Sequence, residues 1–445
     1  MAARTEPRRI LFVGPVFPEP TSSAAGVRTV ALIEDFLSRG DRILFASPSD
    51  RNAFAERLEA RGIATVKIGP NDPAFDAAVR EFAPDVALFD RFMLEEQFGW
   101  RVAEAAPNAL RILDTIDLHF LRRWRGERLA GAIGKRGEGA PVEAETLAEI
   151  AEAGPGIETE DCLRELAAIL RSDLTLVLSR FEMRLLAERF RIDPALLLFH
   201  GFAYPPPSAA EWRSHSERRH FVSIGNFRHL PNRDATFWLA RELWPRIRAK
   251  LRARGENDVE LHLYGAYPPR EIMALDSPRE GLRVFGPVAD AIEALRDYRA
   301  VLAPLRFGAG IKGKIADAWA AGVPVVTTPI GAEGMEEGEG SLFAGAVARN
   351  ADEFAGEALD VYRNEERGRT LRDAGAEALA KNYGAAENRR AFLERVDALL
   401  AEPGALAAHR ARNVFGRVLR SEAFGRTKYF SKWIEEKNKI VRHED

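Results

Sequence analysis

A glycine- and lysine-rich turn is the part of the sequence whose residue types best suit chemistry. Residues 304–326 run from a strand-like segment through three closely spaced glycines into an amphipathic helix. Glycine lets the backbone approach a ligand closely, and the free N–H groups at a helix start favour an anion. Lys312 and Lys314 add positive charge there, and Asp317, within one helical turn of Lys314, could accept hydrogen bonds from ribose hydroxyls. The segment predicts a diphosphate site; a plain tight turn with exposed lysines is the alternative.

A second group of polar side chains lies at the end of an apolar run in the N-terminal half. Asp114, Asp117 and His119 follow one another closely there. Side chains at the carboxyl end of a parallel strand face the cleft where ligands bind. Two carboxylates three residues apart and one histidine are a weak set of metal ligands, so we predict no metal site. A histidine buried for packing alone is the alternative to a functional His119.

Short apolar runs alternate with amphipathic stretches in both halves of the chain. The first half shows strand-like runs at 10–14, 43–46, 66–68, 86–89, 112–116 and 174–178, and a helix over 26–38. The second half shows them at 221–225, 261–265, 282–285, 301–304 and 323–327, with helices over 232–251, 289–296 and 314–321. Ser179 and Glu182 match a capping box. Runs with few polar residues suit parallel sheets covered on both faces, which predicts two doubly wound α/β domains.

Three consecutive prolines, Pro205–Pro207, favour an extended connection between the two halves. We expect a Rossmann-like domain over 1–203, a linker over 204–219, a second Rossmann-like domain over 220–403 and a charged helical tail over 404–445. Residues 121–160 are basic at first and then rich in glycine, alanine and glutamate. We expect an exposed excursion there, either a solvated helix face with a loop or a docking patch for an anionic lipid or acceptor.

Length and composition exclude several classes of function. The chain has 445 residues, more than one ordinary domain, and its formal charge of −3 gives no case for a nucleic-acid partner. Cys162 is the single cysteine, so an internal disulfide is impossible and a reducing compartment fits. No run approaches the roughly 20 apolar residues that cross a bilayer, and the run at 10–14 is too short for a signal peptide. We expect a cytoplasmic protein, with any membrane contact peripheral at the inner face.

Several segments, taken in order, resemble the retaining nucleotide-sugar glycosyltransferases of family 4, also called glycosyltransferase group 1. Besides 304–326, the resemblance rests on Val13–Pro20, Gly26–Arg28, Ser223–Asn232, Phe285–Val288 and Thr328–Gly334. It covers most of the chain and implies the GT-B architecture, in which two Rossmann-like domains face each other across a cleft. A Walker-type loop is absent, and so is a Gly-x-Gly-x-x-Gly fingerprint after the first strand, which disfavours a nicotinamide dehydrogenase.

The resemblance implies which residues meet the donor phosphates. Arg228, in the turn after the first strand of the second domain, and Lys314 would face each other across the site. Arginine suits this role because its planar fork can contact two phosphate oxygens. The further donor contacts implied are Gly26, Arg28, Gly225, Asn226, Gly310 and Lys312.

Other roles follow from the same resemblance. Asp317 stands where the family has the second glutamate of its Glu-x7-Glu motif and would bind the ribose, while His119 would contact a hydroxyl of the donor sugar. Val288 would contact the base through backbone groups. Glu333 either contacts the acceptor or caps a turn. We predict Asn232 as a helix N-cap rather than a ligand.

The first glutamate of that motif is absent, because the residue eight positions before Asp317 is Ala309. We expect a retaining transfer from a UDP- or GDP-sugar to a glycan, a lipid or another acceptor, with no cofactor or metal required. The missing glutamate leaves two alternatives: a catalytically weak nucleotide-sugar-binding partner in glycan assembly, and a nucleotide-sugar epimerase of the same architecture. The expected partners are the nucleotide-sugar donor and a glycan or lipid-linked acceptor, without nucleic acid.

Overall fold

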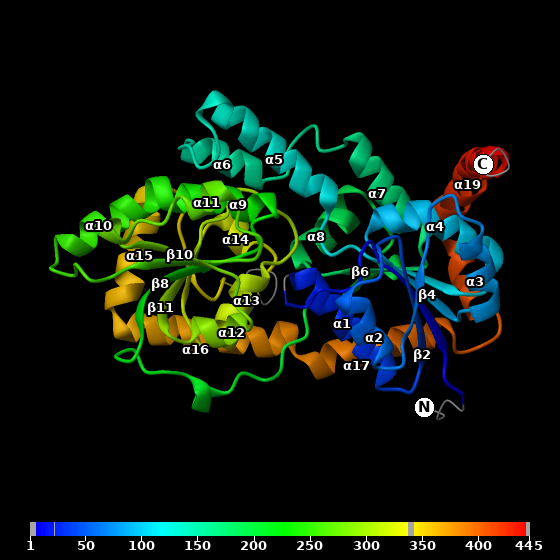
Figure 1. The fold of residues 1–445 in the computed structure, drawn as a ribbon, viewed down its shortest axis with the longest axis horizontal. Coiled ribbons are helices and arrows are strands. Elements are labelled where there is room, and N and C mark those ends of the chain that lie inside the picture. The colour runs from blue at the N-terminus through cyan, green and yellow to red at the C-terminus, as the bar shows by residue number, and fades with distance from the viewer. Residues whose placement is uncertain (1–5, 22, 337–341, 442–445) are drawn as a thin grey trace.

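Two parallel β-sheets, each covered by helices on both faces, make up the chain. The computed structural model describes residues 6–21, 23–336 and 342–441 (Figure 1). The strand order is β3-β2-β1-β4-β5-β6-β7 in the first sheet and β10-β9-β8-β11-β12-β13 in the second. This arrangement confirms the predicted pair of doubly wound α/β domains.

The N-terminal domain is built on the seven-stranded sheet. Its strands are β1 (Arg9–Val13), β2 (Arg42–Ser47), β3 (Ala64–Lys67), β4 (Val86–Asp90), β5 (Leu110–Asp114), β6 (Leu174–Val177) and β7 (Leu197–Phe199). On one face lie α1 (Ala24–Leu37) and α2 (Ala53–Glu59). On the other lie α3 (Ala74–Phe82), α4 (Phe92–Ala105), α5 (His119–Ile133) and α7 (Glu160–Arg171), with α8 (Arg180–Arg184) following β6. The sequence predicted six of these strands; β7 was missed because three residues show no periodicity.

The C-terminal domain is built on the six-stranded sheet. Its strands are β8 (Arg219–Ile224), β9 (Leu261–Tyr264), β10 (Leu282–Gly286), β11 (Tyr298–Ala303), β12 (Val325–Thr327) and β13 (Ala346–Val347). One face is covered by α9 (Leu230–Trp238), α10 (Trp244–Arg252) and α15 (Ala351–Arg363). The other is covered by α12 (Ala291–Leu295), α13 (Gly313–Ala320) and α16 (Glu365–Tyr383). Two single-turn helices, α11 (Arg270–Met273) and α14 (Pro329–Ala332), follow β9 and β12.

The start of α9 differs from the prediction. The helix begins at Leu230, so Asn232 lies inside its first turn and the predicted N-cap is wrong. Pro231 explains the earlier start, because its fixed φ angle suits the first helical turn. The Asn232 amide instead donates to the backbone oxygen of Asn226, 3.0 Å away, which holds the turn after β8 against the helix.

The chain returns to the N-terminal domain after α16. Tyr204, which follows β7, bonds through its backbone to Tyr383 and Ala385 (N···O distances of 2.8 and 3.1 Å). The next helix, α17 (Ala385–Leu399), packs Phe392 against Phe36 of α1, with ring centroids 5.4 Å apart. The predicted boundaries assign α17 to the C-terminal domain, whereas its apolar contacts lie in the N-terminal core.

The predicted helical tail is present as α18 (Ala405–Arg412) and α19 (Val414–Val441). Within residues 6–21, 23–336 and 342–441, no helix is both long enough and apolar enough to span a bilayer.

The predicted exposed excursion over 121–160 is wrong for its helical part. From this segment, α5 and α6 (Ala144–Ala151) lie along the C-terminal domain near α9 and α14 (Figure 1). Leu129, Ile133 and Ile150 form a buried cluster with Phe307 of the C-terminal domain. Leu129 and Ile133 are scattered among charged residues in the sequence but lie on one face of α5. The C-terminal domain covers this face, and the local sequence could not predict that contact.

Candidate active site

The glycine-rich loop between β11 and α13 packs against the N-terminal domain. Gly310 has a φ angle of +64°, and a Cβ atom there would lie 2.8 Å from Cβ of Asp117. Both the left-handed backbone and the close approach therefore require glycine. Ile116, next to this contact, also has a positive φ of 61°. A strained backbone at a strand–helix turn is frequent at functional sites.

Glu182 joins this loop to the turn between β5 and α5. Its carboxylate oxygen Oε1 accepts from the backbone N–H groups of Gly310 (2.7 Å) and Leu118 (3.0 Å). Ser179 caps α8 as predicted, but the second half of the capping box is wrong, because the carboxylate does not return to the cap. The loop of the other domain offers a free N–H group that the local sequence could not reveal. Complete burial raises the pKa of Glu182, and the nearby Asp117 carboxylate raises it further.

A buried ion pair fastens α5 to the C-terminal domain beside the same loop. The guanidinium of Arg125 donates to both carboxylate oxygens of Glu333 at 2.8 and 2.7 Å, and to the backbone oxygen of Gly308 at 2.9 Å. Lys312 is buried nearby and donates to the backbone oxygen of Gly310 at 2.8 Å. Burial lowers the pKa of Lys312, while Glu333 opposes the shift. The predicted acceptor contact of Glu333 stays a prediction.

Lys314 and the turn after β8 meet at the start of α13. A Cβ atom on Gly225 would lie 2.9 Å from Nζ of Lys314, so the glycine leaves room for the ammonium group. Burial lowers the pKa of Lys314 to about 8, and Asp317 partly offsets the effect. A cation at a helix N-terminus beside a glycine turn is suited to an anionic ligand.

Asp317 has a partner that the sequence did not indicate. The hydroxyl of Tyr204 donates to its Oδ1 atom at 2.6 Å. Burial raises the pKa of Asp317 to about 6, although the hydrogen bond from Tyr204 opposes the shift. Tyr204 lies just before the three prolines, and the sequence around it gives no sign of this contact.

Arg228 lies at the open edge of the site. Its backbone N–H donates to Oδ1 of Asn226 at 2.9 Å, and its exposed guanidinium lies 3.7 Å from the ring centroid of Tyr267. The Tyr267 hydroxyl donates to a carboxylate oxygen of Glu19 in the N-terminal domain at 3.2 Å. Val288 is half-buried beside α12 and α13, after β10.

His119 is the first residue of α5, at the carboxyl end of the N-terminal sheet. Its Nε2 atom lies 3.3 Å from Oδ1 of Asp117. Burial lowers the pKa of His119 to about 4, although Asp117 opposes the shift, so the imidazole is neutral at pH 7. Arg122 pairs with Asp117 and, despite burial, holds the pKa of that carboxyl down to about 2.

His229 is a candidate site residue that the sequence reasoning missed. Although His229 has an exposed surface, desolvation by the surrounding protein lowers its pKa to about 4, and the charges of Arg122, Asp117 and Lys314 act on it as well. Those charges come from both domains, so the imidazole lies between the two groups of predicted residues. It is adjacent to Arg228 in the sequence, which was the signal available.

Gly26 and Arg28 occupy the start of α1. A Cβ atom on Gly26 would collide with the backbone of Glu19. Arg28 is buried and donates to the Asp114 carboxylate (2.8 Å) and to the backbone oxygen of His200 (2.7 Å). These contacts of Arg28 lie inside the N-terminal domain, and its predicted contact with donor phosphates stays a prediction.

A possible set of metal ligands lies elsewhere. In the described part of the chain, one group of three side chains has the spacing for a cation: His220, Glu260 and His262. His220 and His262 lie near the amino ends of β8 and β9, away from the glycine-rich loop. Nδ1 of His220 accepts from the backbone N–H of Glu260 at 3.1 Å, which leaves the ring proton on Nε2. The neutral ring then lacks a free lone pair for a metal.

Comparisons with known proteins concern the fold and one stretch of the sequence. Residues 218–364 match the family model described as glycosyl transferases group 1. No curated protein sequence matches the chain. A glycosyltransferase from Rickettsia africae is similar in structure (TM-score 0.61, 12% identity, 90% of this chain and 100% of that chain covered). HepE of Anabaena in complex with UDP-glucose is similar as well (TM-score 0.58, 13% identity, 88% of this chain and 99% of that chain covered). So is sucrose-phosphate synthase from Thermosynechococcus elongatus (TM-score 0.60, 14% identity, 88% of this chain and 100% of that chain covered).

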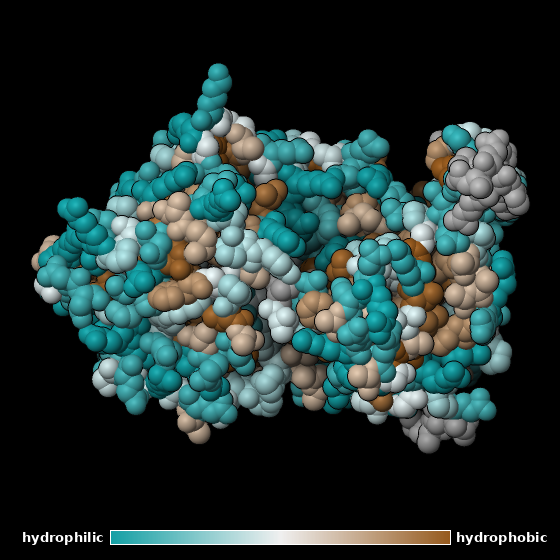
Figure 2. All heavy atoms as spheres, viewed as in Figure 1, coloured by the Kyte–Doolittle hydropathy of each residue, from teal (hydrophilic) through white to brown (hydrophobic). Residues whose placement is uncertain are grey.

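The chain therefore has the GT-B architecture that the resemblance implied, with two facing parallel-sheet domains and a helical tail. In its C-terminal half, the stretch that matches the group 1 glycosyltransferase model runs from β8 to the end of α15. On the face shown in Figure 2, hydrophilic and hydrophobic residues are mixed along the boundary between the two domains.

Proposed function

We propose that this protein is a retaining glycosyltransferase that moves a sugar from a nucleoside-diphosphate sugar to a glycan or lipid-linked acceptor. The observation that carries the proposal is the meeting of Lys314, the Gly225 turn and the start of α13, at the carboxyl end of the C-terminal sheet. The family model over residues 218–364 supports glycosyl transfer. HepE, which shares the fold, is described in complex with UDP and with UDP-glucose, which supports a UDP-sugar as donor.

The donor would lie across the start of α13. The Lys314 ammonium and the free N–H groups of the first helical turn would hold the diphosphate, and Arg228 would supply a second cation. With a pKa of about 8, Lys314 is mostly protonated at neutral pH. Asp317, oriented by Tyr204, would accept from the ribose hydroxyls, and backbone groups of Val288 would contact the base.

Charge development on the diphosphate explains how this arrangement would accelerate transfer. As the bond between the anomeric carbon and the diphosphate oxygen breaks, negative charge grows on that oxygen. Lys314, Arg228 and the helix dipole stabilise this charge more in the transition state than in the ground state. The acceptor hydroxyl attacks the same face of the sugar, and its proton passes to the departing diphosphate oxygen. The neutral His119 imidazole would contact a sugar hydroxyl without adding charge.

Binding and turnover can be measured separately. Calorimetric titration with UDP, GDP and TDP should identify one preferred nucleotide. Lys314→Met should weaken its binding by about 10- to 100-fold, since a hydrogen bond to a charged group contributes about 1.5–3 kcal/mol. Lys381→Met is the matched control, because Lys381 is exposed on α16 and pairs with Glu377. The control should bind as the wild type does.

The turnover assay uses the preferred nucleotide-sugar with a panel of glycan and lipid-linked acceptors. A product whose anomeric configuration matches the donor, as seen by NMR, supports the proposal. Tight binding without transfer to any acceptor would favour a nucleotide-sugar-binding partner instead. An epimerised donor in the absence of acceptor would favour the epimerase. Equal affinity of Lys314→Met and the wild type would refute the placement of the diphosphate.

A further inference from the structure

A stripe of large apolar side chains lies exposed along α19. Its members are Val414, Phe415, Val418, Tyr429, Phe430 and Trp433, whose exposed fractions range from 51% to 74%. Phe415 and Trp433 are separated by about five full helical turns, so the two ends of the stripe lie on one side of the helix. The rings of Phe430 and Trp433 stack, with centroids 5.9 Å apart. Exposed apolar side chains that gather in this way at both ends of one helix face mark an interaction surface.

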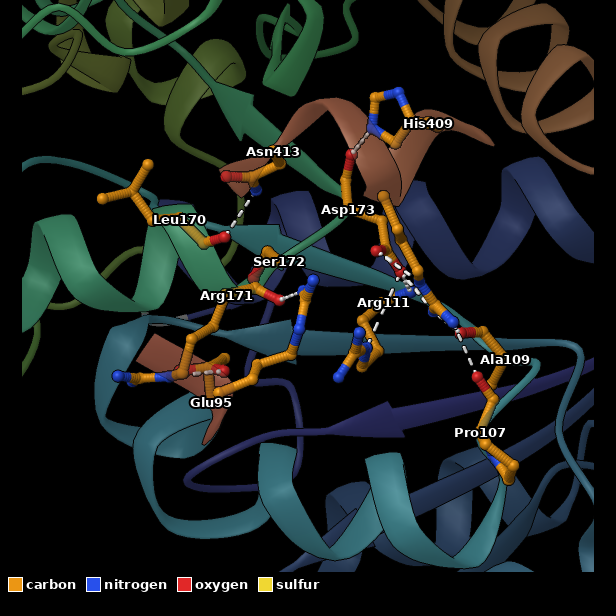
Figure 3. A network of polar contacts seen from close by, with 12 residues as sticks. Glu95, Pro107, Ala109, Arg111, Leu170, Arg171, Ser172, Asp173, His409 and Asn413 are labelled. Atoms are coloured by element: carbon orange, nitrogen blue, oxygen red, sulfur yellow. Dashed lines mark hydrogen bonds and ion pairs between the residues drawn. The ribbon is translucent and has the colours of Figure 1, made fainter. Parts of the chain in front are cut away.

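The tail is anchored to the N-terminal domain just before this stripe. In Figure 3, His409 and Asn413 contact the backbone oxygens of Asp173 and Leu170, each at 2.7 Å. Arg410 forms an ion pair with the Asp173 carboxylate at 2.7 Å. These bonds fix where α19 begins and in which direction it leaves α18.

The opposite face of α19 is tied down as well. Arg420 donates to the backbone oxygen of Arg171 at 3.0 Å, and Glu435 pairs with Arg101 of α4 at 2.5 Å. Ser431 donates to the side chain of Asn71 at 3.1 Å. By helical periodicity these residues lie on the side away from Phe415 and Trp433. The helix cannot turn its apolar stripe inward without breaking these contacts.

The charge of α19 is opposite in sign to that of the whole protein. Residues 414–441 contain seven basic and three acidic side chains, a formal charge of +4, whereas the whole chain carries −3. Lys432 and Lys437 are exposed beside the stripe, and the Lys437 ammonium lies 5.4 Å from the Trp433 ring centroid. Exposed aromatic rings flanked by basic side chains characterise helices that lie in the headgroup region of an anionic bilayer.

We propose that α19 is a docking surface for an anionic lipid bilayer. The helix lies parallel to the membrane, with the Phe415–Trp433 stripe in the boundary between headgroups and acyl chains and the exposed lysines against lipid phosphates. A second copy of this chain is a poorer occupant, because pairing two such faces would bring together two helices of charge +4. The docking surface stands apart from the donor site and does not depend on the proposed function.

Vesicle flotation with the full chain tests the proposal. We expect the protein to float together with vesicles made of equal parts of phosphatidylcholine and phosphatidylglycerol. It should remain in the bottom fraction when the vesicles contain phosphatidylcholine alone. Lys432→Gln/Lys437→Gln should lower the partition coefficient by about 25-fold, roughly fivefold for each lysine. Phe430→Ser/Trp433→Ser should lower it at least as much, with an unchanged circular dichroism spectrum.

Two matched controls locate the effect. Met273→Ser alters an exposed apolar side chain on α11, and Lys135→Glu alters an exposed lysine just after α5. Both should float as the wild type does. Binding lost in Lys135→Glu but kept in the α19 variants would overturn the proposal, and so would equal flotation with both vesicle types. A dimer that Phe430→Ser/Trp433→Ser converts to monomer, without any vesicle binding, would assign the stripe to a second copy.

Discussion

Replacing Arg125 with methionine should destabilise the protein far more than the same change at Arg123, two residues away on α5. Arg125 is fully buried between the domains, where it pairs with Glu333 and donates to the Gly308 backbone oxygen. Arg123 also forms an ion pair, with Asp161, but its side chain is 61% exposed. The two variants share the helix, the chemistry and the size of the change, so burial is the main difference between them.

The expected magnitudes follow from what each substitution leaves behind. Arg125→Met strands the largely buried Glu333 carboxylate and the Gly308 oxygen, and breaking a buried pair in this way costs about 3–5 kcal/mol. Arg123→Met leaves Asp161 with water and a second partner, Arg164, so the cost should be about 0–1 kcal/mol. In Arg125→Met/Glu333→Leu no buried charge is left unpaired, and this double variant should recover part of the loss.

Urea unfolding followed by tryptophan fluorescence gives the free energy of unfolding for each variant. If Arg125→Met lost no more stability than Arg123→Met, the buried pair would not hold α5 to the C-terminal domain. A double variant less stable than Arg125→Met would likewise contradict the reasoning, since packing rather than the stranded charge would then dominate.

Three further outcomes follow from the site. UDP affinity, measured by calorimetry, should fall as the pH rises through about 8, where Lys314 loses its proton, and Lys314→Arg should extend binding to higher pH; a flat profile would exclude this role. The pKa of Asp317 is raised from 3.8 in the unfolded chain to about 6 in the folded protein, so the neutral carboxyl stabilises the fold. This stabilisation is fully present below pH 3.8 and is lost as the pH rises through 6. Wild-type stability relative to Asp317→Asn should therefore fall by up to about 3 kcal/mol between about pH 4 and pH 7, and parallel urea profiles would contradict it. Gly310→Ala should lower both the free energy of unfolding and the UDP affinity, because its Cβ would strike Asp117. Gly131→Ala in α5, with open space around the residue, should instead stabilise the protein by roughly 1 kcal/mol. Opposite shifts would refute the assigned backbone constraint.

The alternation of apolar runs and amphipathic stretches was enough to predict both sheets. Strands such as β1, β4 and β11 are nearly continuous apolar runs, and these stand out because both faces of a parallel sheet are buried. β7 and β13 were missed because two or three residues carry no periodic signal. The glycine-rich turn was visible too, since glycines, lysines and a helix start are all local features.

Contacts between the domains could not be predicted in the same way. From the sequence alone, Arg125 belongs to a basic stretch expected to face solvent, and Glu182 is half of a local capping box. In the structure the second domain supplies their partners, which are Glu333 and the Gly310 N–H group. Tyr204 was likewise predicted only as part of the linker, whereas in the structure its hydroxyl lies 2.6 Å from Oδ1 of Asp317 on α13. In each case the partner lies more than a hundred residues away in the chain.

The sequence by itself determined the fold class, the position of the glycine-rich turn at the start of α13 and the charge that gathers there. All of these depend on residues within one strand–turn–helix unit, whose geometry is local. The tertiary structure decided which buried charges have partners, how the loop at Gly310 is held, and which face of α19 stays exposed. These depend on the packing of one domain against the other and of the tail against the first, and the hydrophobic pattern along a chain leaves that packing open.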